Sequence, residues 1–374
     1  MTYRSPFGSP PPALEENGAE IPAEHDFGPI LVGLRPLIPR ALLDGPGWER
    51  VLERVGGLPG NAVAAACGFE FRLDQVAPAA DVSIPVKPGL ALERYVAGAD
   101  GMAAPGSAQA VLARHLHRIH GIPSARIDET MLEFDVASIA PGARPAPGLF
   151  VKFRNADPGQ VARILLDAKG LAPDRRERLA LDRALAALPP QGEIIQAGVL
   201  LGRARRGVRL VARKIRLSDV PGYLERLGQP GPVATWTAVV REIEDLFRTF
   251  WLSFDVAAAG VSPRIGLEFG PCADKRNVAV SGRWWATGLR DWRPIIDRLE
   301  ARGWCLPVKA RGLRSWPGRD TIFESRGVFT AYRGINHIKL VLGDGPVHAK
   351  AYAGMAYRPI GPPDAGRAGR RSGR

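Results

Sequence analysis

The chain has 374 residues, of which 45% are hydrophobic, and its formal net charge is +13 at pH 7. This length allows one large domain or two ordinary ones, and the hydrophobic fraction is typical of a globular protein that buries a full core. The sequence contains no run of about 18 apolar residues, so composition does not favour a membrane-spanning helix.

The sequence begins Met-Thr-Tyr-Arg-Ser-Pro, without the apolar segment of a secretory signal, and contains three widely spaced cysteines. An odd number of scattered cysteines indicates a reduced, cytoplasmic protein with buried thiols, not a disulfide framework or a zinc site. The basic excess points to an anionic partner. The body of the chain has no Lys/Arg block interleaved with aromatic residues, so nucleic acid is not the favoured partner; binding of nucleic acid through the basic tail remains an alternative.

Composition divides the chain into three parts. Residues 1–28 are expected to be a flexible lead-in, residues 29–360 a single domain, and residues 361–374 a disordered basic tail. Within the domain, periodicity predicts elements in an alternating order. In chain order these are a helix over 37–58, strands over 67–73 and 81–87, helices over 90–98 and 108–120, strands over 131–136 and 148–154, helices over 158–168 and 175–188, strands over 193–201 and 208–215, helices from 218 and over 237–247, strands over 250–256 and 263–269, helices over 292–302 and 306–316, and a strand pair within 336–352.

The last strand pair shows the pattern most clearly. A Gly343-Asp344-Gly345 turn joins its strands, and side chains alternate between two faces. One face is apolar, with Ile338, Leu340, Leu342, Ala349, Ala351 and Ala353. The opposite face is basic and carries a hydroxyl group, with His337, Lys339, His348, Lys350 and Tyr352.

The order helix–helix–strand–strand occurs five times, which predicts one repeated architecture. The segments 132–137 and 252–257 even resemble each other in sequence. We therefore expect an α+β fold: a closed ten-stranded antiparallel barrel built from five ααββ repeats, with the helices outside. A wet outer face would explain the polar side of any single hairpin, but the same bias in five hairpins favours a polar lumen that holds a ligand.

Short motifs accompany this order of elements. The first hairpin contains Glu70 and Val82-Ser-Ile-Pro85, the second contains Phe134-Asp-Val136 and Lys152, and the last contains Lys350-Ala-Tyr352. With the element order over roughly residues 37–357, they resemble the aromatic prenyltransferases of the ABBA type, known as PT barrels. The motifs are most similar to the fungal indole branch, exemplified by dimethylallyltryptophan synthase. Three segments depart from the Lys/Arg-and-Tyr motifs of that branch: Arg154 in place of a tyrosine, Arg209-Leu-Val-Ala-Arg213, and Gly266-Leu-Glu268.

The resemblance implies a transferase that moves an isoprenoid group from dimethylallyl or geranyl diphosphate to an indole, tryptophan or phenol. Because the family includes bacterial enzymes that prenylate ribosomal peptides, a peptide side chain is also a candidate acceptor. Glu70 matches the glutamate that orients the acceptor N–H in the indole branch. The implied diphosphate-binding residues are Lys152, Arg154, Arg209, Arg213, Arg264, Lys339, Lys350 and Tyr352.

These residue types suit that chemistry. Inward-facing cations can stabilise the diphosphate that leaves when the donor ionises, and π faces can shield the allylic cation from water. Tyr352 is the only tyrosine that the pattern places inward, so Phe150, Trp251 and the Trp284-Trp285 pair are candidate substitutes. The chain has no Asp-Asp-x-x-Asp motif, so neither Mg²⁺ nor another cofactor is expected.

Two alternatives remain. The barrel could bind an anionic metabolite or peptide without catalysis. On the helix expected over 108–120, His117 and His120 are spaced to share a face, but no carboxylate accompanies them in the register of a metal site. A solvated helix face is the favoured interpretation of that pair.

Overall fold

The structure is a computed structural model that describes most of the chain. The described residues are 27–58, 60, 63, 66–86, 118, 121–122, 126–137, 146–167, 175–203, 207–229, 231–271, 288–324, 327–343 and 345–360. Several sequence predictions fall outside these residues: the basic tail, nearly all of the lead-in, nearly all of the helices over 90–98 and 108–120, the histidine pair, and Trp284-Trp285.

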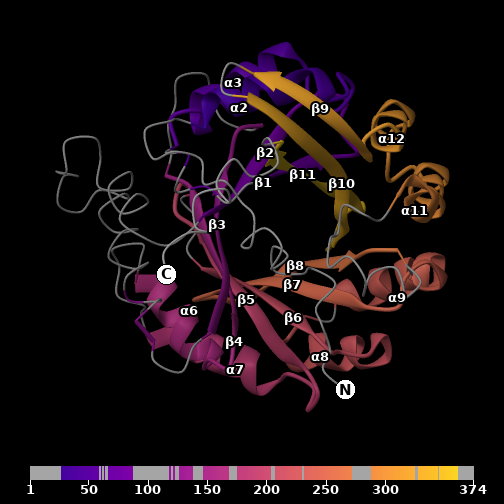
Figure 1. Ribbon diagram of the computed structural model, residues 1–374. Coiled ribbons are helices and arrows are strands. Elements are labelled where there is room, and N and C mark those ends of the chain that lie inside the picture. The colour runs from indigo at the N-terminus through magenta and orange to yellow at the C-terminus, as the bar shows by residue number, and fades with distance from the viewer. Residues whose placement is uncertain are drawn as a thin grey trace, which may run out of the picture.

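Ten antiparallel strands form a closed barrel, with helices around its outside (Figure 1). Each strand pairs with its neighbours in chain order, except that β10 follows β8 directly in the barrel and β9 pairs only with β10 outside it. The strands are β1 (Ala66–Arg72), β2 (Ala80–Val86), β3 (Arg126–Phe134), β4 (Gly148–Arg154), β5 (Glu193–Leu200), β6 (Val208–Arg213), β7 (Phe250–Ala257), β8 (Gly260–Phe269), β9 (Gly318–Glu324), β10 (Gly327–Leu342) and β11 (His348–Pro359).

The described helices lie before β1 and in the connections between hairpins. Two of them separate β4 from β5, two separate β6 from β7, and two separate β8 from β9. They are α2 (Gly28–Leu34), α3 (Gly45–Val55), α6 (Pro158–Asp167), α7 (Arg175–Ala186), α8 (Val220–Arg226), α9 (Gly231–Ile243), α11 (Leu289–Ala301) and α12 (Pro307–Arg314), with short 3₁₀ turns η1 (Arg35–Leu37), η3 (Leu217–Asp219) and η4 (Glu244–Leu246). None of the described helices is long and apolar enough to cross a lipid bilayer.

The hydrophobic core lies between the outer face of the barrel and the helices. Phe69 and Phe71 project outward from β1, and the Trp316 ring after α12 meets both edge-on, at centroid distances of 5.9 and 5.4 Å. All three side chains are at most 1% exposed. These outward positions of β1 are therefore removed from water by the helical layer, and burial of apolar surface stabilises the fold by roughly 25 cal/mol per Å². Burial of the outer face leaves the polar positions to line the lumen.

Pairing of β11 with both β1 and β10 closes the barrel. Tyr352 lies opposite Glu70 on one side and opposite His337 on the other. Directly paired residues in antiparallel strands share a face, so these three side chains all point into the lumen. Closure thus brings together residues that are far apart along the chain.

The predicted closed ten-stranded antiparallel barrel with helices outside is confirmed, as is its α+β class. The five-fold repeat remains a prediction, since most of the chain between β2 and β3 lies outside the described residues. The two described cysteines, Cys67 and Cys305, are buried free thiols. At the start of the domain, Phe27 is fully buried, and its ring centroid lies 6.2 Å from that of Tyr357.

Several segments differ from the sequence prediction. β3 begins at Arg126 instead of 131, α9 begins at Gly231 instead of 237, and α2 was not predicted. The helix expected over 37–58 begins only at Gly45, because Asp44 caps it by accepting a 2.7 Å hydrogen bond from Gly47 N, and Pro46 occupies its first turn. The last strand pair is longer than the predicted 336–352, and β9 was not predicted.

Candidate functional site

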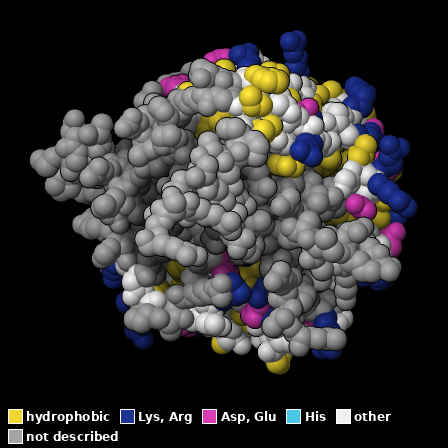
Figure 2. Space-filling view, viewed as in Figure 1, with side chains coloured by type: hydrophobic (Ala, Val, Ile, Leu, Met, Phe, Trp, Pro, Cys, Tyr) yellow, Lys and Arg dark blue, Asp and Glu magenta, His cyan; other side chains and the backbone are white. Residues whose placement is uncertain are grey.

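The lumen face carries acidic and basic side chains from several strands of the barrel. On the side of the molecule seen in Figure 2, acidic and basic side chains lie next to each other near the centre. The barrel has two ends: the hairpin turns lie at the turn end, and the helical connections leave and enter at the connection end (Figure 1). The candidate site residues lie at the connection end, in the middle of the lumen and at the turn end.

Glu70 is the centre of the first cluster. Its carboxylate accepts a 2.5 Å hydrogen bond from Lys350 Nζ and a second hydrogen bond from the Tyr352 hydroxyl. Burial alone would raise the pKa of Glu70, but Lys350 and Tyr352 outweigh that effect and lower it to about 2. Burial and the negative charge of Glu70 raise the pKa of Tyr352 well above its ordinary value. The cluster therefore holds a carboxylate, an ammonium and a neutral phenol.

A second ion pair lies beside the first. Lys339 Nζ is 3.0 Å from Glu268 Oε1, and the Lys339 side chain is 8% exposed. Gly266 makes this contact possible, since a Cβ atom at that position would lie 2.4 Å from Lys339 Cε. His337 lies 3.8 Å from Glu268, and burial lowers its pKa to about 4, so the imidazole is neutral at pH 7. Lys339 is thus balanced by a single carboxylate.

Arg209 forms the third pair, on the far side of the lumen. Its guanidinium donates to both carboxylate oxygens of Asp255, at 2.8 and 3.1 Å. Glu133 lies within electrostatic range of Arg209 and of Glu70. Burial, and then the negative charge of Glu70, raise the pKa of Glu133 to about 7. Asp135 at the turn end is bound by Arg203 from the β5–β6 turn.

Three predicted residues lie together at the connection end. Lys152 stands opposite Glu129 in the β3–β4 register, and burial lowers its pKa while Glu129 partly restores it. Arg154, at the rim, donates two 2.6 Å hydrogen bonds to Asp128. Arg213 pairs with Glu193, and its charge reaches Lys152.

The structure thus separates the predicted site residues. Glu70, Lys339, Lys350, Tyr352 and Arg209 lie within electrostatic range of one another in the middle of the lumen. The cations Lys152, Arg154 and Arg213 occupy the connection end. Arg264 is exposed at the turn end, where its Cγ is the nearest atom to a Cβ built at Gly343. Seven of the eight predicted diphosphate ligands are Lys or Arg, and six of these lie beside a carboxylate. Most of the predicted cations thus have an acidic partner, so the described lumen is close to charge-balanced.

Aromatic side chains occur at several lumen positions. The His337 and Tyr352 rings stack with centroids 4.2 Å apart. Phe150 lies across Gly198, where an added Cβ would come within 2.1 Å of its ring. Trp251 packs with Ile195 and Val211 in a small apolar cluster apart from the main core.

Sequence reasoning did not identify several residues of this network. Asp255, Asp128 and Glu193 neutralise predicted cations, and none was assigned a role. Asp255 alternates with Phe254 and Val256, so strand periodicity carried the signal for its inward direction. Tyr332 was also missed: it pairs with Ala356 on the same face as Tyr352, because β10 begins well before Asn336 and a bulge between Ile335 and His337 shifts the alternation.

Among the described residues, no three or more His, Cys, Asp or Glu side chains gather in a way that could hold a metal ion. Lysine and arginine are instead the groups available to an anionic ligand. Comparison of the sequence with protein-family models and with curated proteins finds no match.

Proposed function

We propose that the protein is a prenyltransferase of the PT-barrel type, built from five ααββ repeats, which transfers an isoprenoid group from an allylic diphosphate to an aromatic or peptide acceptor in the barrel lumen. The observation that carries this proposal is the Glu70–Lys350–Tyr352 cluster inside a closed ten-stranded antiparallel barrel. It combines, at one place, an ionised carboxylate, a cation and an aromatic hydroxyl. These are the groups that the reaction needs for proton removal, leaving-group binding and cation shielding.

In the proposed reaction, the diphosphate binds among Lys350, Lys339 and Arg209. The charges of Lys350 and Arg209 both reach Lys339 and repel it, and a polyanion among the three cations would relieve that repulsion. Binding requires these cations to turn from their carboxylates toward the diphosphate. One bound diphosphate can accept hydrogen bonds from all three cations at once, in a site shielded from water.

The same exchange prepares Glu70 for its role. Once Lys350 binds the diphosphate, Glu70 keeps only the Tyr352 hydrogen bond, and its burial then raises its proton affinity. The allylic C–O bond breaks, and its electron pair leaves with the diphosphate. The allylic cation forms a bond to a carbon of the acceptor ring, and the proton lost from that carbon passes to Glu70. The stacked rings of Tyr352 and His337 offer a π face beside the cation.

A second candidate function is supported by the charge balance of the lumen. Because the central cations already hold carboxylates, the barrel could bind an anionic metabolite or peptide without ionising it. The two functions differ in whether a covalent product forms and in whether Lys350 controls binding.

A product assay tests the proposal. The protein is incubated with dimethylallyl or geranyl diphosphate and a panel of indoles, phenols and tryptophan- or tyrosine-containing peptides, and adducts are detected by mass spectrometry. We expect adducts whose mass exceeds that of the acceptor by one prenyl group less one hydrogen. Glu70→Gln and Lys350→Met should each reduce product formation by at least about 100-fold, as is common for general bases and charge-stabilising groups.

Arg178→Gln is the matched control, because this exposed arginine of α7 lies on the outer helical layer. It should retain wild-type activity. Absence of any adduct across the panel, together with binding of a diphosphate analogue that is indifferent to Lys350→Met, would support the binding protein instead.

A further inference from the structure

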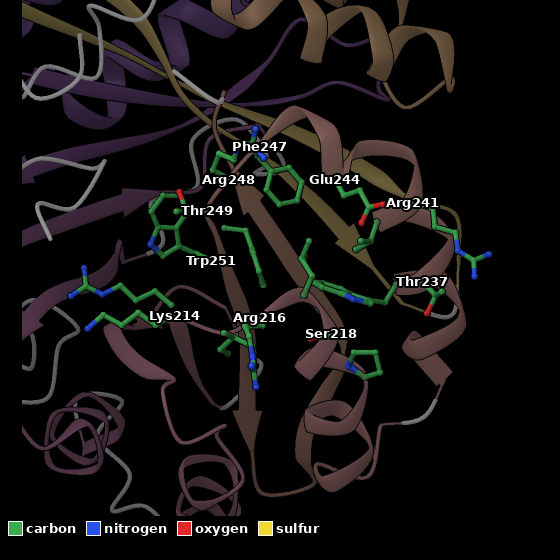
Figure 3. A pocket seen from close by; sticks show the side chains of 17 residues that line it. Lys214, Arg216, Ser218, Thr237, Arg241, Glu244, Phe247, Arg248, Thr249 and Trp251 are labelled. Carbon is green, nitrogen blue, oxygen red and sulfur yellow. The ribbon is translucent and has the colours of Figure 1, made fainter. Parts of the chain in front are cut away.

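A cavity outside the lumen cluster lies at the connection end of the barrel. It has a volume of about 890 Å³ and is lined by the end of β6, the η3 turn, α9 and the start of β7. Figure 3 shows Lys214 and Trp251 on one side of this space and Thr237 and Arg241 of α9 on the other. Its size falls within the range of small-molecule sites, which bury most of their ligand.

Basic side chains dominate the polar part of this cavity. Its lining includes Arg213, Lys214, Arg216, Arg241 and Arg248, but only one acidic residue, Glu244. Two carboxylates just outside the lining take part as well. Glu193 is shared by Arg213 and Lys214, and Asp219 accepts from Arg216 at 2.9 Å. Within the lining itself, basic residues outnumber acidic ones by five to one, so this cavity differs from the charge-balanced lumen.

Aromatic and aliphatic side chains form the rest of the lining. Trp236 of α9 lies against Phe250 at a centroid distance of 5.9 Å, and Phe247 lies 6.2 Å from the same ring. Val240 of α9 extends this apolar wall, and Trp251 lies on the opposite side of the cavity. Such a surface accommodates a flat or branched hydrocarbon body.

The backbone at Lys214 is held in an unusual conformation. Its φ is 59°, in the left-handed region that residues other than Gly, Asn and Asp seldom adopt. This conformation ends β6 and turns the chain toward η3 along the wall of the cavity. Lysine at such a position is a poor choice for stability alone, and non-glycine residues with such φ values cluster at ligand sites.

We propose that this cavity binds an amphipathic anion: a molecule with an aromatic or branched aliphatic body, seated against Trp236 and Phe250, and a sulfonate, phosphate or carboxylate head attracted by the basic residues of the lining, Lys214 and Arg248 among them. The site is separate from the Glu70 cluster, and the proposal does not depend on prenyl transfer.

A matched pair of fluorescent probes tests it. 8-Anilino-1-naphthalenesulfonate carries the anionic head, and N-phenyl-1-naphthylamine has the same rings without it. We expect the sulfonate to bind more tightly than the neutral probe. The double variant Lys214→Asn/Arg248→Gln, in which asparagine tolerates the left-handed backbone, should weaken sulfonate binding by at least about fivefold and change binding of the neutral probe by less than about twofold. Glu244→Gln should strengthen sulfonate binding.

Two further variants locate the bound probe. Ser218→Trp places an indole in the cavity without changing charge and should weaken binding of both probes. Arg178→Gln removes an exposed charge on α7 and should change neither. Circular dichroism and the melting temperature verify that each variant is folded. Equal loss of both probes in the double variant, or unchanged sulfonate binding in Ser218→Trp, would overturn the proposal.

Discussion

Lys350 is the cation on which the charge of Glu70 depends. Its side chain is 25% exposed, whereas that of Glu70 is only 8% exposed, so the carboxylate is the more deeply buried partner. Lys350→Met should reduce the free energy of unfolding by about 2–3 kcal/mol, because it leaves a buried charge without its partner. Urea denaturation at pH 7 measures this loss.

The double variant Glu70→Gln/Lys350→Met provides the check on that cause. Removing both charges should restore at least about half of the lost stability, since the penalty comes from the unpaired carboxylate. If the double variant is as unstable as the sum of the two single variants, the pair is not coupled as the distances indicate.

Glu133 gives a pH dependence of known sign. Its pKa is about 7 in the folded protein and near 4.5 in the unfolded chain. Between these values the folded protein holds a proton that the unfolded chain has lost, so this group makes stability fall as pH rises from 4.5 to 7. As pH rises from 4.5 to 7, the free energy of unfolding of Glu133→Gln should therefore increase relative to that of the wild type by about 1–3 kcal/mol.

The quantity to follow is the difference in the free energy of unfolding between Glu133→Gln and the wild type. His337, with a pKa of about 4, makes stability rise with pH up to its ordinary value near 6.5 in both of them. Denaturation curves at pH 4.5, 6 and 7.5 isolate the contribution of Glu133. A stability difference that does not change with pH would contradict the assignment.

The directions of single side chains could be predicted from the sequence, but their partners could not. Alternation placed Glu70, Lys339 and Lys350 on inward faces, and the structure agrees. That Lys350 meets Glu70, 280 residues earlier, follows only from closure of the barrel. Strand periodicity carries no information about which strands pair where the barrel closes.

Glycine positions within the strands control how the lumen is filled. At Gly198 of β5 the Phe150 ring covers the backbone so closely that a Cβ would lie 2.1 Å from it. Gly198→Ala should push this ring aside and destabilise the protein by about 1–3 kcal/mol, the usual effect of overpacking. Gly57→Ala is the control, because nothing lies within 4 Å of its added methyl group, and it should change stability by less than about 0.5 kcal/mol. Equal melting temperatures for the two variants would show that Phe150 moves freely.

Elements with regular alternation were predicted well, whereas irregular ones were not. The bulge between Ile335 and His337 breaks the two-residue period of β10, so the first half of this strand does not continue the pattern of the second. β9 joins the sheet only by pairing with that first half, from Arg333↔Gly318 to Gly327↔Glu324. An edge strand with a single partner has a weak sequence signal, because half of its surface stays outside the core.

For the whole molecule, repetition of similar hairpins was the information that predicted a closed barrel. The ion pairs of the lumen were not predictable in the same way. Acids such as Asp255 and Glu268 stand beside the inward Lys and Arg residues on neighbouring strands. Which acid faces which cation depends on the register between strands, which the sequence does not show directly.

In the proposed reaction, the cations in the middle of the lumen exchange their carboxylates for a diphosphate. Isothermal titration with geranyl S-thiolodiphosphate, which does not ionise readily, measures that exchange directly. We expect the wild type to bind, Lys350→Met to bind at least about tenfold more weakly, and Lys214→Asn in the cavity at the connection end to stay within about threefold of the wild type. Absence of wild-type binding, or weakening by Lys214→Asn with none by Lys350→Met, would contradict the proposal.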